Sequence, residues 1–268
     1  MLSNKAAVTG VALLLVTAGC GGYDGVVVNS SDSAEPSESA VVTTPLDGIT
    51  EVRLDARSAG VDVRSAPGAR AEVRQEIETH EGGDPNRPRH QVDGTSLRLR
   101  DCGRDCSIRY VVTLPEPVPV TGELTSGALD VDGMREVDVT GGSGRLKVAR
   151  VDGPVRVRTT TGRIELDGVR GSVDVESTTG QLTGEDVSAG TVAAKLRSGQ
   201  IDLGLTAPRD VRAETGTGTI ALRVPDGPYR VDAQAGVGSR DVRVAEDPGS
   251  DRRLALRVET GGIEVEPG

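Results

Sequence analysis

A short phrase recurs along the second half of the chain and restricts the folds that the chain can adopt. Each copy has a Ser or Thr, then a Gly, then a variable residue and a Leu or Ile. The glycine of the phrase recurs in steps of 17 to 19 residues, at Gly127, Gly144, Gly162, Gly180, Gly199 and Gly218. This period is too short for a helical-hairpin repeat, so each repeat is predicted to be one coil of strands in a solenoid.

Each repeat holds two runs in which apolar and polar residues alternate, as in Ile164-Glu165-Leu166 and Val173-Asp174-Val175. Alternation with β-branched residues on one side indicates half-buried strands. The repeat has no room for a crossover helix, so the coils are expected to stack in parallel, each pairing with the coils before and after it. The apolar columns would then face the interior, and the absence of Phe and Trp from all 268 residues suits a narrow one.

The opposite columns carry charges whose sign alternates from coil to coil. One column is predicted to hold Asp138, Arg156 and Asp174, and the other Asp130, Lys147 and Glu165. Stacked strands lie roughly 4.8 Å apart, so opposite charges would become neighbours. Each exposed pair contributes only about 0.2–1 kcal/mol, so the buried Val, Leu and Ile columns must provide most of the stability.

The first 20 residues have the features of a targeting segment. Lys5 supplies a positive charge, an apolar stretch follows, and Ala18-Gly19-Cys20 closes the segment. This resembles a bacterial lipoprotein signal peptide, although Thr17 departs from the usual Leu, and the resemblance implies a diacylated Cys20. The alternative is an ordinary secretory signal with a chance cysteine. A lipidated Cys20 predicts an extracytoplasmic protein, anchored by lipid to the outer face of the cell membrane.

Composition divides the rest of the chain. Residues 21–46 are rich in Gly, Ser, Glu and Pro and are predicted to be a disordered tether. Residues 47–268 form the β-solenoid domain, with irregular N-terminal coils over 47–120 and regular coils over 121–268. Two polar breaks, Glu81 to His90 and Arg240 to Arg253, are expected to be loops, and the last coil follows the second break.

Two cysteines remain once Cys20 is assigned to lipid. Cys102 and Cys106 lie four residues apart in an exported domain, so a local disulfide is expected. The alternatives are a redox pair or half of a zinc site. A thioredoxin-like pair needs two intervening residues, and zinc needs two more ligands, whereas His80 and His90 lack ligand spacing. The sequence therefore offers no catalytic, cofactor-binding or metal-ligating residue.

Carboxylates on the exterior leave one enzymatic alternative open. Some parallel β-helices are polysaccharide lyases or hydrolases that use Asp clusters. Here the outward Asp and Glu are interleaved with Arg and Lys, and the three tyrosines offer no aromatic platform for a sugar. A groove with three or more carboxylates unpaired by Arg would favour the enzyme. The net charge of −10 argues against nucleic acid as a partner.

The segment Cys102-Gly-Arg-Asp-Cys106-Ser-Ile-Arg-Tyr110-Val-Val-Thr-Leu-Pro115, followed by the repeated coils, resembles a known bacterial family. This is the DUF4097-like group, described as β-strand-repeat "putative adhesin" proteins, and in particular its lipid-anchored actinobacterial members. The resemblance covers roughly Ile49 to Gly268 and implies a right-handed parallel β-helix outside the cytoplasm. Our leading hypothesis is a non-enzymatic envelope lipoprotein. It would act as a scaffold or adhesin-like module that binds an envelope protein or glycan of unknown identity. The alternative is a carbohydrate-active β-helix enzyme that acts on envelope or extracellular polysaccharide.

Overall fold

The computed structural model describes residues 37–80, 84–208 and 210–268, and the regular elements in these ranges are all β-strands. Among the described residues, no helix has the length and apolar content needed to span a bilayer. The strands are β1 (Glu38–Pro45), β2 (Glu51–Ser65), β3 (Glu72–Thr79), β4 (Gln91–Asp93), β5 (Ser96–Arg100), β6 (Cys106–Leu114), β7 (Pro119–Asp132), β8 (Glu136–Ala149), β9 (Val155–Asp167), β10 (Val173–Val187), β11 (Thr191–Leu205), β12 (Asp210–Val224), β13 (Pro228–Val242), β14 (Ala245–Glu246) and β15 (Arg253–Pro267).

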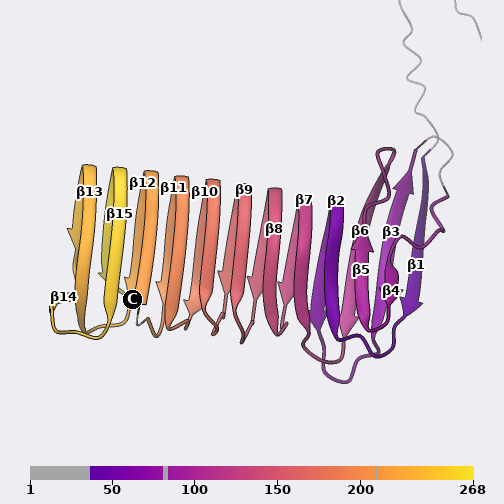
Figure 1. Cartoon of the computed structure of the whole chain (residues 1–268), viewed down its shortest axis with the longest axis horizontal. Helices are drawn as coiled ribbons and strands as arrows, with labels where there is room; N and C mark the ends of the chain where they lie inside the picture. The colour runs from indigo at the N-terminus through magenta and orange to yellow at the C-terminus, as the bar shows by residue number, and fades with distance from the viewer. Residues whose placement is uncertain (1–36, 81–83, 209) are drawn as a thin grey trace, which may run out of the picture. The chain divides into compact units, whose positions relative to one another are not determined.

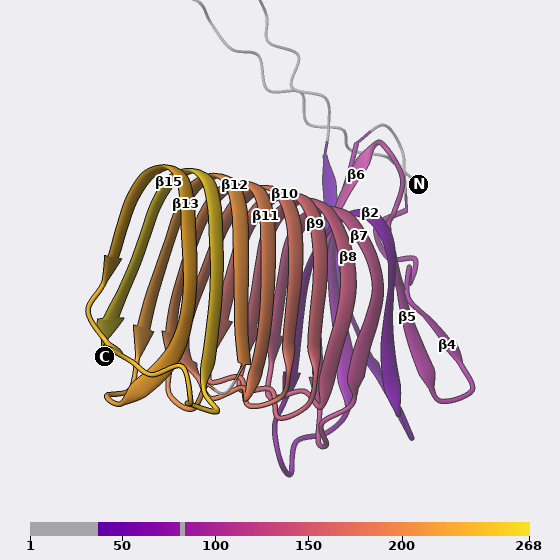
Figure 2. The same cartoon turned by 60° about the vertical axis from the view of Figure 1, so that its left-hand side comes forward.

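The regular coils are long strands that bend over an arch, so that each coil has two legs (Figure 2). Strands β7 to β12 follow one another in parallel, and each repeat pairs with the equivalent residues of the next one. Ile164 is 2% exposed and Val175 is 0% exposed, as expected for the inward columns. The predicted all-β solenoid of parallel coils is therefore confirmed.

The glycine of each phrase lies where the strand bends. Gly144 has a φ of 134° and pairs with Gly127 on one side and Gly162 on the other. A Cβ atom at Gly144 would lie 1.8 Å from the carbonyl oxygen of Gly127. Backbone conformation and the approach of the neighbouring coil therefore both require glycine here. The adjoining hydroxyls form a column, and in it the Ser126 Oγ donates to the carbonyl of Arg57 at 3.1 Å.

The order of the last coils differs from the expected one. β15 lies between β12 and β13, so the last strand in sequence is not the last in space (Figure 1). Arg240 of β13 occupies the column position that Ile220 and Ile263 hold in the two preceding coils, and it forms an ion pair with Glu246 at 2.8 Å. A charge at an inward position makes β13 a poor template for a further strand. The terminal place therefore suits β13 better than β15.

The prediction of a disordered tether over residues 21–46 is wrong for the last residues of that segment. Residues 21–36 lie outside the described part of the chain, but Glu38–Pro45 forms β1, which pairs antiparallel with β3. Its side chains are mostly exposed, including Val41 at 57%. Backbone hydrogen bonds to the edge of β3 hold this strand, and composition does not reveal such bonds.

The N-terminal region is a cap built partly from antiparallel pairs. β3 lies between β1 and β6 and is antiparallel to both. β5 pairs with the first leg of β2, and β6 pairs with the second leg. β5 and β6 therefore form the two legs of one coil, the cap coil, which is interrupted between them. Irregular coils were expected here, but the antiparallel layer of β1 and β3 was not.

Candidate functional site

The disulfide lies at the bend of the cap coil. Cys102 and Cys106 are bonded, with their Cα atoms 6.0 Å apart, as predicted from their spacing. The bond joins the segment between β5 and β6 at the place where the regular coils carry Ser/Thr-Gly. Cys20, the predicted lipidation site, lies outside the described residues. His90 lies in the cap, with its Nδ1 3.3 Å from the Gln75 Oε1. Burial lowers the pKa of the His90 imidazole.

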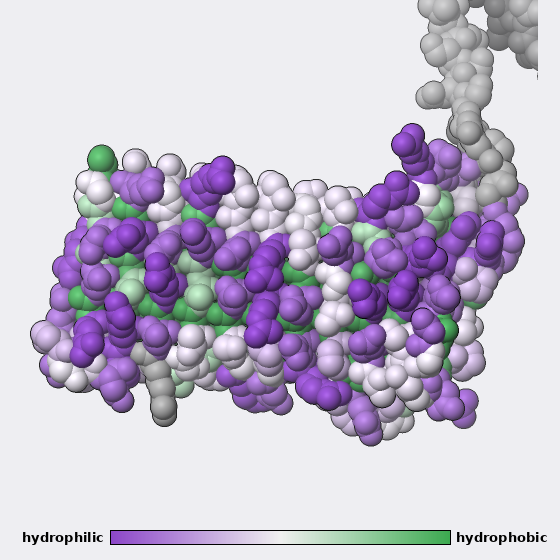
Figure 3. All heavy atoms as spheres, in the orientation of Figure 1, coloured by the Kyte–Doolittle hydropathy of each residue, from purple (hydrophilic) through white to green (hydrophobic). Residues whose placement is uncertain are grey.

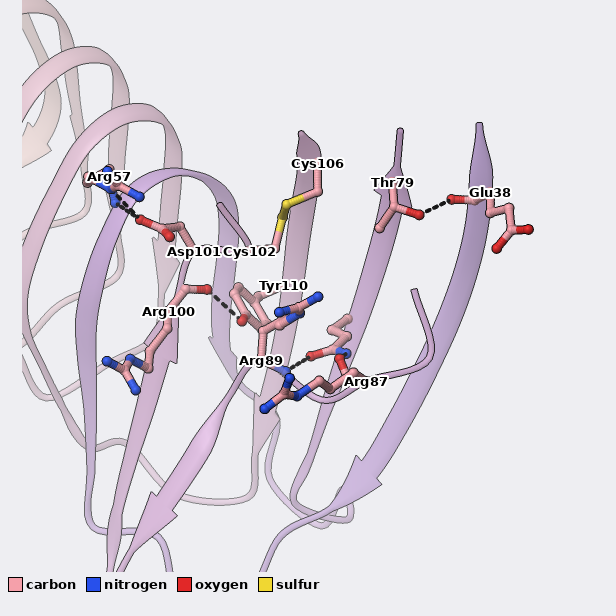
Figure 4. Close-up of a disulfide and its surroundings, with 11 residues drawn as sticks. Glu38, Arg57, Thr79, Arg87, Arg89, Arg100, Asp101, Cys102, Cys106 and Tyr110 are labelled. Atoms are coloured by element: carbon pink, nitrogen blue, oxygen red, sulfur yellow. Dashed lines mark hydrogen bonds and ion pairs between the residues drawn. A yellow bond between two sulfur atoms is a disulfide. The ribbon is translucent and has the colours of Figure 1, made fainter. Parts of the chain in front are cut away.

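Asp101, the residue before the disulfide loop, contacts the next coil. The backbone N–H and the Nε of Arg57 both donate to the Asp101 Oδ2, at 2.9 and 3.1 Å (Figure 4). Burial by itself would raise the pKa of Asp101, but the hydrogen bonds from Arg57 outweigh it and leave that pKa below its usual value. The carboxylate is therefore ionised at neutral pH and ties the bend of the cap coil to that of β2.

A polar cleft of about 490 Å³ opens beside this contact. Its size is within the usual range for small-ligand sites. Four elements supply its walls: strand β2, the end of β5 with the residue after it, the segment 84–90, and strand β7. The charged lining residues are Asp55, Arg57, Arg87, Arg89, Arg100, Asp101 and Glu123.

Gln75 of β3 fixes the segment that carries Arg87 and Arg89. The Gln75 side chain is 0% exposed. Its Nε2 donates to the carbonyl of Arg87 at 3.0 Å, and its Oε1 accepts from the backbone N–H of Arg89 at 2.9 Å. Glu81 to His90 were expected to be a mobile loop, and the structure describes residues 84–90 of it. One buried amide instead sets the course of this segment and places two arginines at the cleft.

Tyr110 holds the backbone of Arg100, one of the residues that line the cleft. Its side chain is fully buried, and its hydroxyl donates to the carbonyl of Arg100 at 2.8 Å. Burial raises its pKa, so the hydroxyl stays protonated and remains a donor. This hydrogen bond links β6, the second leg of the cap coil, to the last residue of β5, which is its first leg.

The solenoid exterior bears the predicted charge columns. Asp138, Arg156 and Asp174 are register neighbours, and so are Asp130, Lys147 and Glu165. Hydrophilic side chains are spread along the face seen in Figure 3. Some ion pairs join register neighbours, as Arg158 and Glu176 do at 3.9 Å, but several others join residues from different columns. They include Arg145 with Asp130 at 3.7 Å, Arg156 with Glu136 at 3.6 Å, and Arg223 with Asp202 at 3.0 Å.

One group of carboxylates comes near to the arrangement that an enzyme would need. Asp62 and Asp130 are register neighbours on β2 and β7, with Asp132 two residues further along β7. Burial, with a contribution from the charge of Asp130, raises the pKa of Asp62 against the opposing effect of Arg64. Asp130 and Asp132 are each paired with an arginine, Arg145 and Arg150 respectively. Within the described ranges, no group of three or more His, Cys, Asp or Glu is arranged to hold a metal ion.

Sequence reasoning identified the disulfide but missed the cleft. Its arginines come from the non-repeating part of the chain, and their proximity depends on a segment whose course one buried glutamine sets. The only available signal was the density of arginine between residues 87 and 109, which is also typical of a solvated surface.

One family model and two solved structures are similar to this chain. The family model described as Toastrack DUF4097 matches residues 49–260, which is most of the chain. No curated protein matches the chain. Two solved structures are similar to the chain. A "putative cell adhesion protein" from Clostridium sporogenes is 12% identical with a TM-score of 0.29, over 87% of this chain and 100% of that one. A "putative adhesin" from Bacteroides fragilis is 10% identical with a TM-score of 0.33, over 85% of this chain and 97% of that one.

The matched span includes the cap from β2 onward, the disulfide, the cleft and the regular coils up to the bend of β15. The chain therefore belongs to the Toastrack family, DUF4097.

Proposed function

We propose that this protein is a non-enzymatic, adhesin-like binding module of the cell envelope, anchored to the outer face of the membrane through a lipid on Cys20. The lipoprotein-like ending Ala18-Gly19-Cys20 supports the anchor. The stack of parallel coils supports a structural or binding role because it is a regular, many-stranded scaffold with polar side chains along its exterior. Its partner is an envelope protein or a glycan.

The observation that carries the non-enzymatic proposal is the pairing of outward carboxylates with arginine. Asp130, Asp202 and Glu176 each lie within 4.0 Å of a guanidinium nitrogen. A general acid needs a raised pKa in an apolar, unpaired setting, and a neighbouring cation favours the ionised carboxylate instead. These carboxylates therefore lack the unpaired setting that a general acid requires.

The alternative, a carbohydrate-active enzyme, is favoured by one observation, the raised pKa of Asp62. Incubating the full chain with peptidoglycan-like, pectin-like and arabinogalactan-like polymers separates the two functions. We expect no new reducing ends and no unsaturated products. If products accumulate, and are lost with Asp62→Asn, the protein is an enzyme and the proposal is wrong.

The anchor is tested by Cys20→Ala in cells. We expect the variant to leave the membrane fraction or to stay uncleaved, and to incorporate no labelled palmitate. A variant that matures, takes up palmitate and sediments with membranes would show that Cys20 is not the anchor.

A further inference from the structure

The cap cleft holds more arginine than its own carboxylates engage. Four arginines and three carboxylates line it. Arg57 is bound to Asp101, and Arg100 lies 3.8 Å from Asp55. Arg87 and Arg89 have no acidic partner among the described residues. We infer that this cleft is a binding site for a compact oxyanion, a phosphate or carboxylate group of a small ligand or of a polymer end.

Arg89 is the residue that most clearly lacks a partner. Its Nε is buried and has no hydrogen-bond partner within the described part of the chain. A buried donor without an acceptor is costly, and the cost is greater for a charged group. The Gln75 amide holds the backbone at Arg87 and at Arg89 through one hydrogen bond to each. The backbone that carries both arginines is therefore fixed in advance, which reduces the entropy lost when a ligand binds.

The chemistry of the side chains selects an oxyanion. A guanidinium presents its N–H donors in a planar fork that matches two oxygens of a phosphate or carboxylate. The second unengaged arginine, Arg87, is exposed and lines the same cleft. One anionic group placed there would offset the positive charge of Arg87 and Arg89, which no ion pair among the described residues engages.

The surrounding charge limits the size of the ligand. The whole chain carries a net charge of −10, and Asp55 and Glu123 lie in the lining of the cleft itself. Charges further away than the Debye length of about 8 Å are largely screened at physiological salt, so the arginines dominate inside the cleft. An extended polyanion would run beyond them into the acidic surroundings. A single oxyanion would not.

This inference goes beyond the proposed function, because it requires neither membrane anchoring nor adhesion. The test is calorimetric titration of the full chain, in neutral detergent at low salt, with inorganic phosphate and separately with acetate. We expect saturable binding of one equivalent of at least one of the two, and the tighter one identifies the group. Arg89→Gln should weaken binding about tenfold or more, as expected for the loss of a charge-assisted hydrogen bond.

Two further variants make the result decisive. Arg87→Gln removes an exposed side chain that makes no hydrogen bond in the structure, so it should weaken binding without affecting folding. Arg163→Gln is the matched control, since Arg163 is an exposed arginine of β9 outside the cleft. The inference fails if neither anion binds saturably. It also fails if Arg163→Gln weakens binding as much as the cleft variants do.

Discussion

The glycine at the bend of each coil should be indispensable, and Gly144→Ala tests this most directly. The φ of 134° at this residue lies in a region that side chains rarely adopt, at a cost of about 1–3 kcal/mol. The new Cβ would lie 1.8 Å from the Gly127 oxygen, which is 1.2 Å inside the 3.0 Å that Cβ atoms keep. Adjacent strands lie only about 4.8 Å apart, so relief requires local separation of β7 from β8.

That separation breaks ladder hydrogen bonds, each with a net contribution of about 0.5–1.5 kcal/mol. Adding the strain gives a loss of about 3–5 kcal/mol in the free energy of unfolding, which is large among single substitutions. The assay is guanidinium unfolding followed by far-UV circular dichroism, with linear extrapolation to water.

Gly141→Ala is the control within the same strand. Its Cβ would meet the Thr159 Cγ2 at 3.4 Å and the Leu124 oxygen at 3.5 Å, which are ordinary contacts, and its φ is not positive. We expect a change below about 1 kcal/mol. Equal effects of the two substitutions would refute the argument that the bend selects glycine through φ and close approach.

Two further predictions concern the legs of the coils. Ile164→Asp places a carboxylate in the interior and should lower the free energy of unfolding by about 3–5 kcal/mol, whereas Arg163→Asp on the exposed side should change it by less than about 0.5 kcal/mol. Equal losses in guanidinium unfolding would contradict the assigned faces. The second prediction follows from the burial that raises the pKa of Asp62. The folded state then binds the proton of the Asp62 carboxyl more tightly than the unfolded state does. The stability that this protonation contributes is fully present below the ordinary Asp pKa of about 3.9, and it is lost as pH rises through the pKa of Asp62 in the folded state. Asp62→Asn should therefore match the parent protein near pH 3 and exceed its stability at pH 7. Urea unfolding at both pH values checks this, and a variant less stable at pH 7 would contradict it.

The regular coils could be predicted from sequence because one pattern determines them repeatedly. Alternation assigned Ile164 and Val175 to the interior, and the period aligned the bends. The same pattern could not show whether β13 or β15 lies next to β12, because both strands match the repeat. The usable signal was Arg240, which stands at an apolar position and marks a coil with no further coil beyond it.

The cap was less predictable because its contacts do not repeat. β1 is held by backbone pairing, so its sparse apolar side chains suggested a tether. The cleft depends on Gln75, whose role is evident only when β3 and the segment 84–90 are seen together. Alternation places Gln75 in the same phase as the buried Val73 and Ile77, but it does not show which backbone groups the amide will bond.

The position of β15 has a consequence for how the chain is made. β13 comes before β15 in the chain, yet β15 takes the edge of β12. β12 and β13 each pair with β15 in matching register, Gly218 and Gly238 both opposite Gly261. The nascent β13 can therefore dock on β12 in the same alignment. β13 and β15 thus offer the same alignment to one edge of β12, and in the completed stack β15 holds that edge.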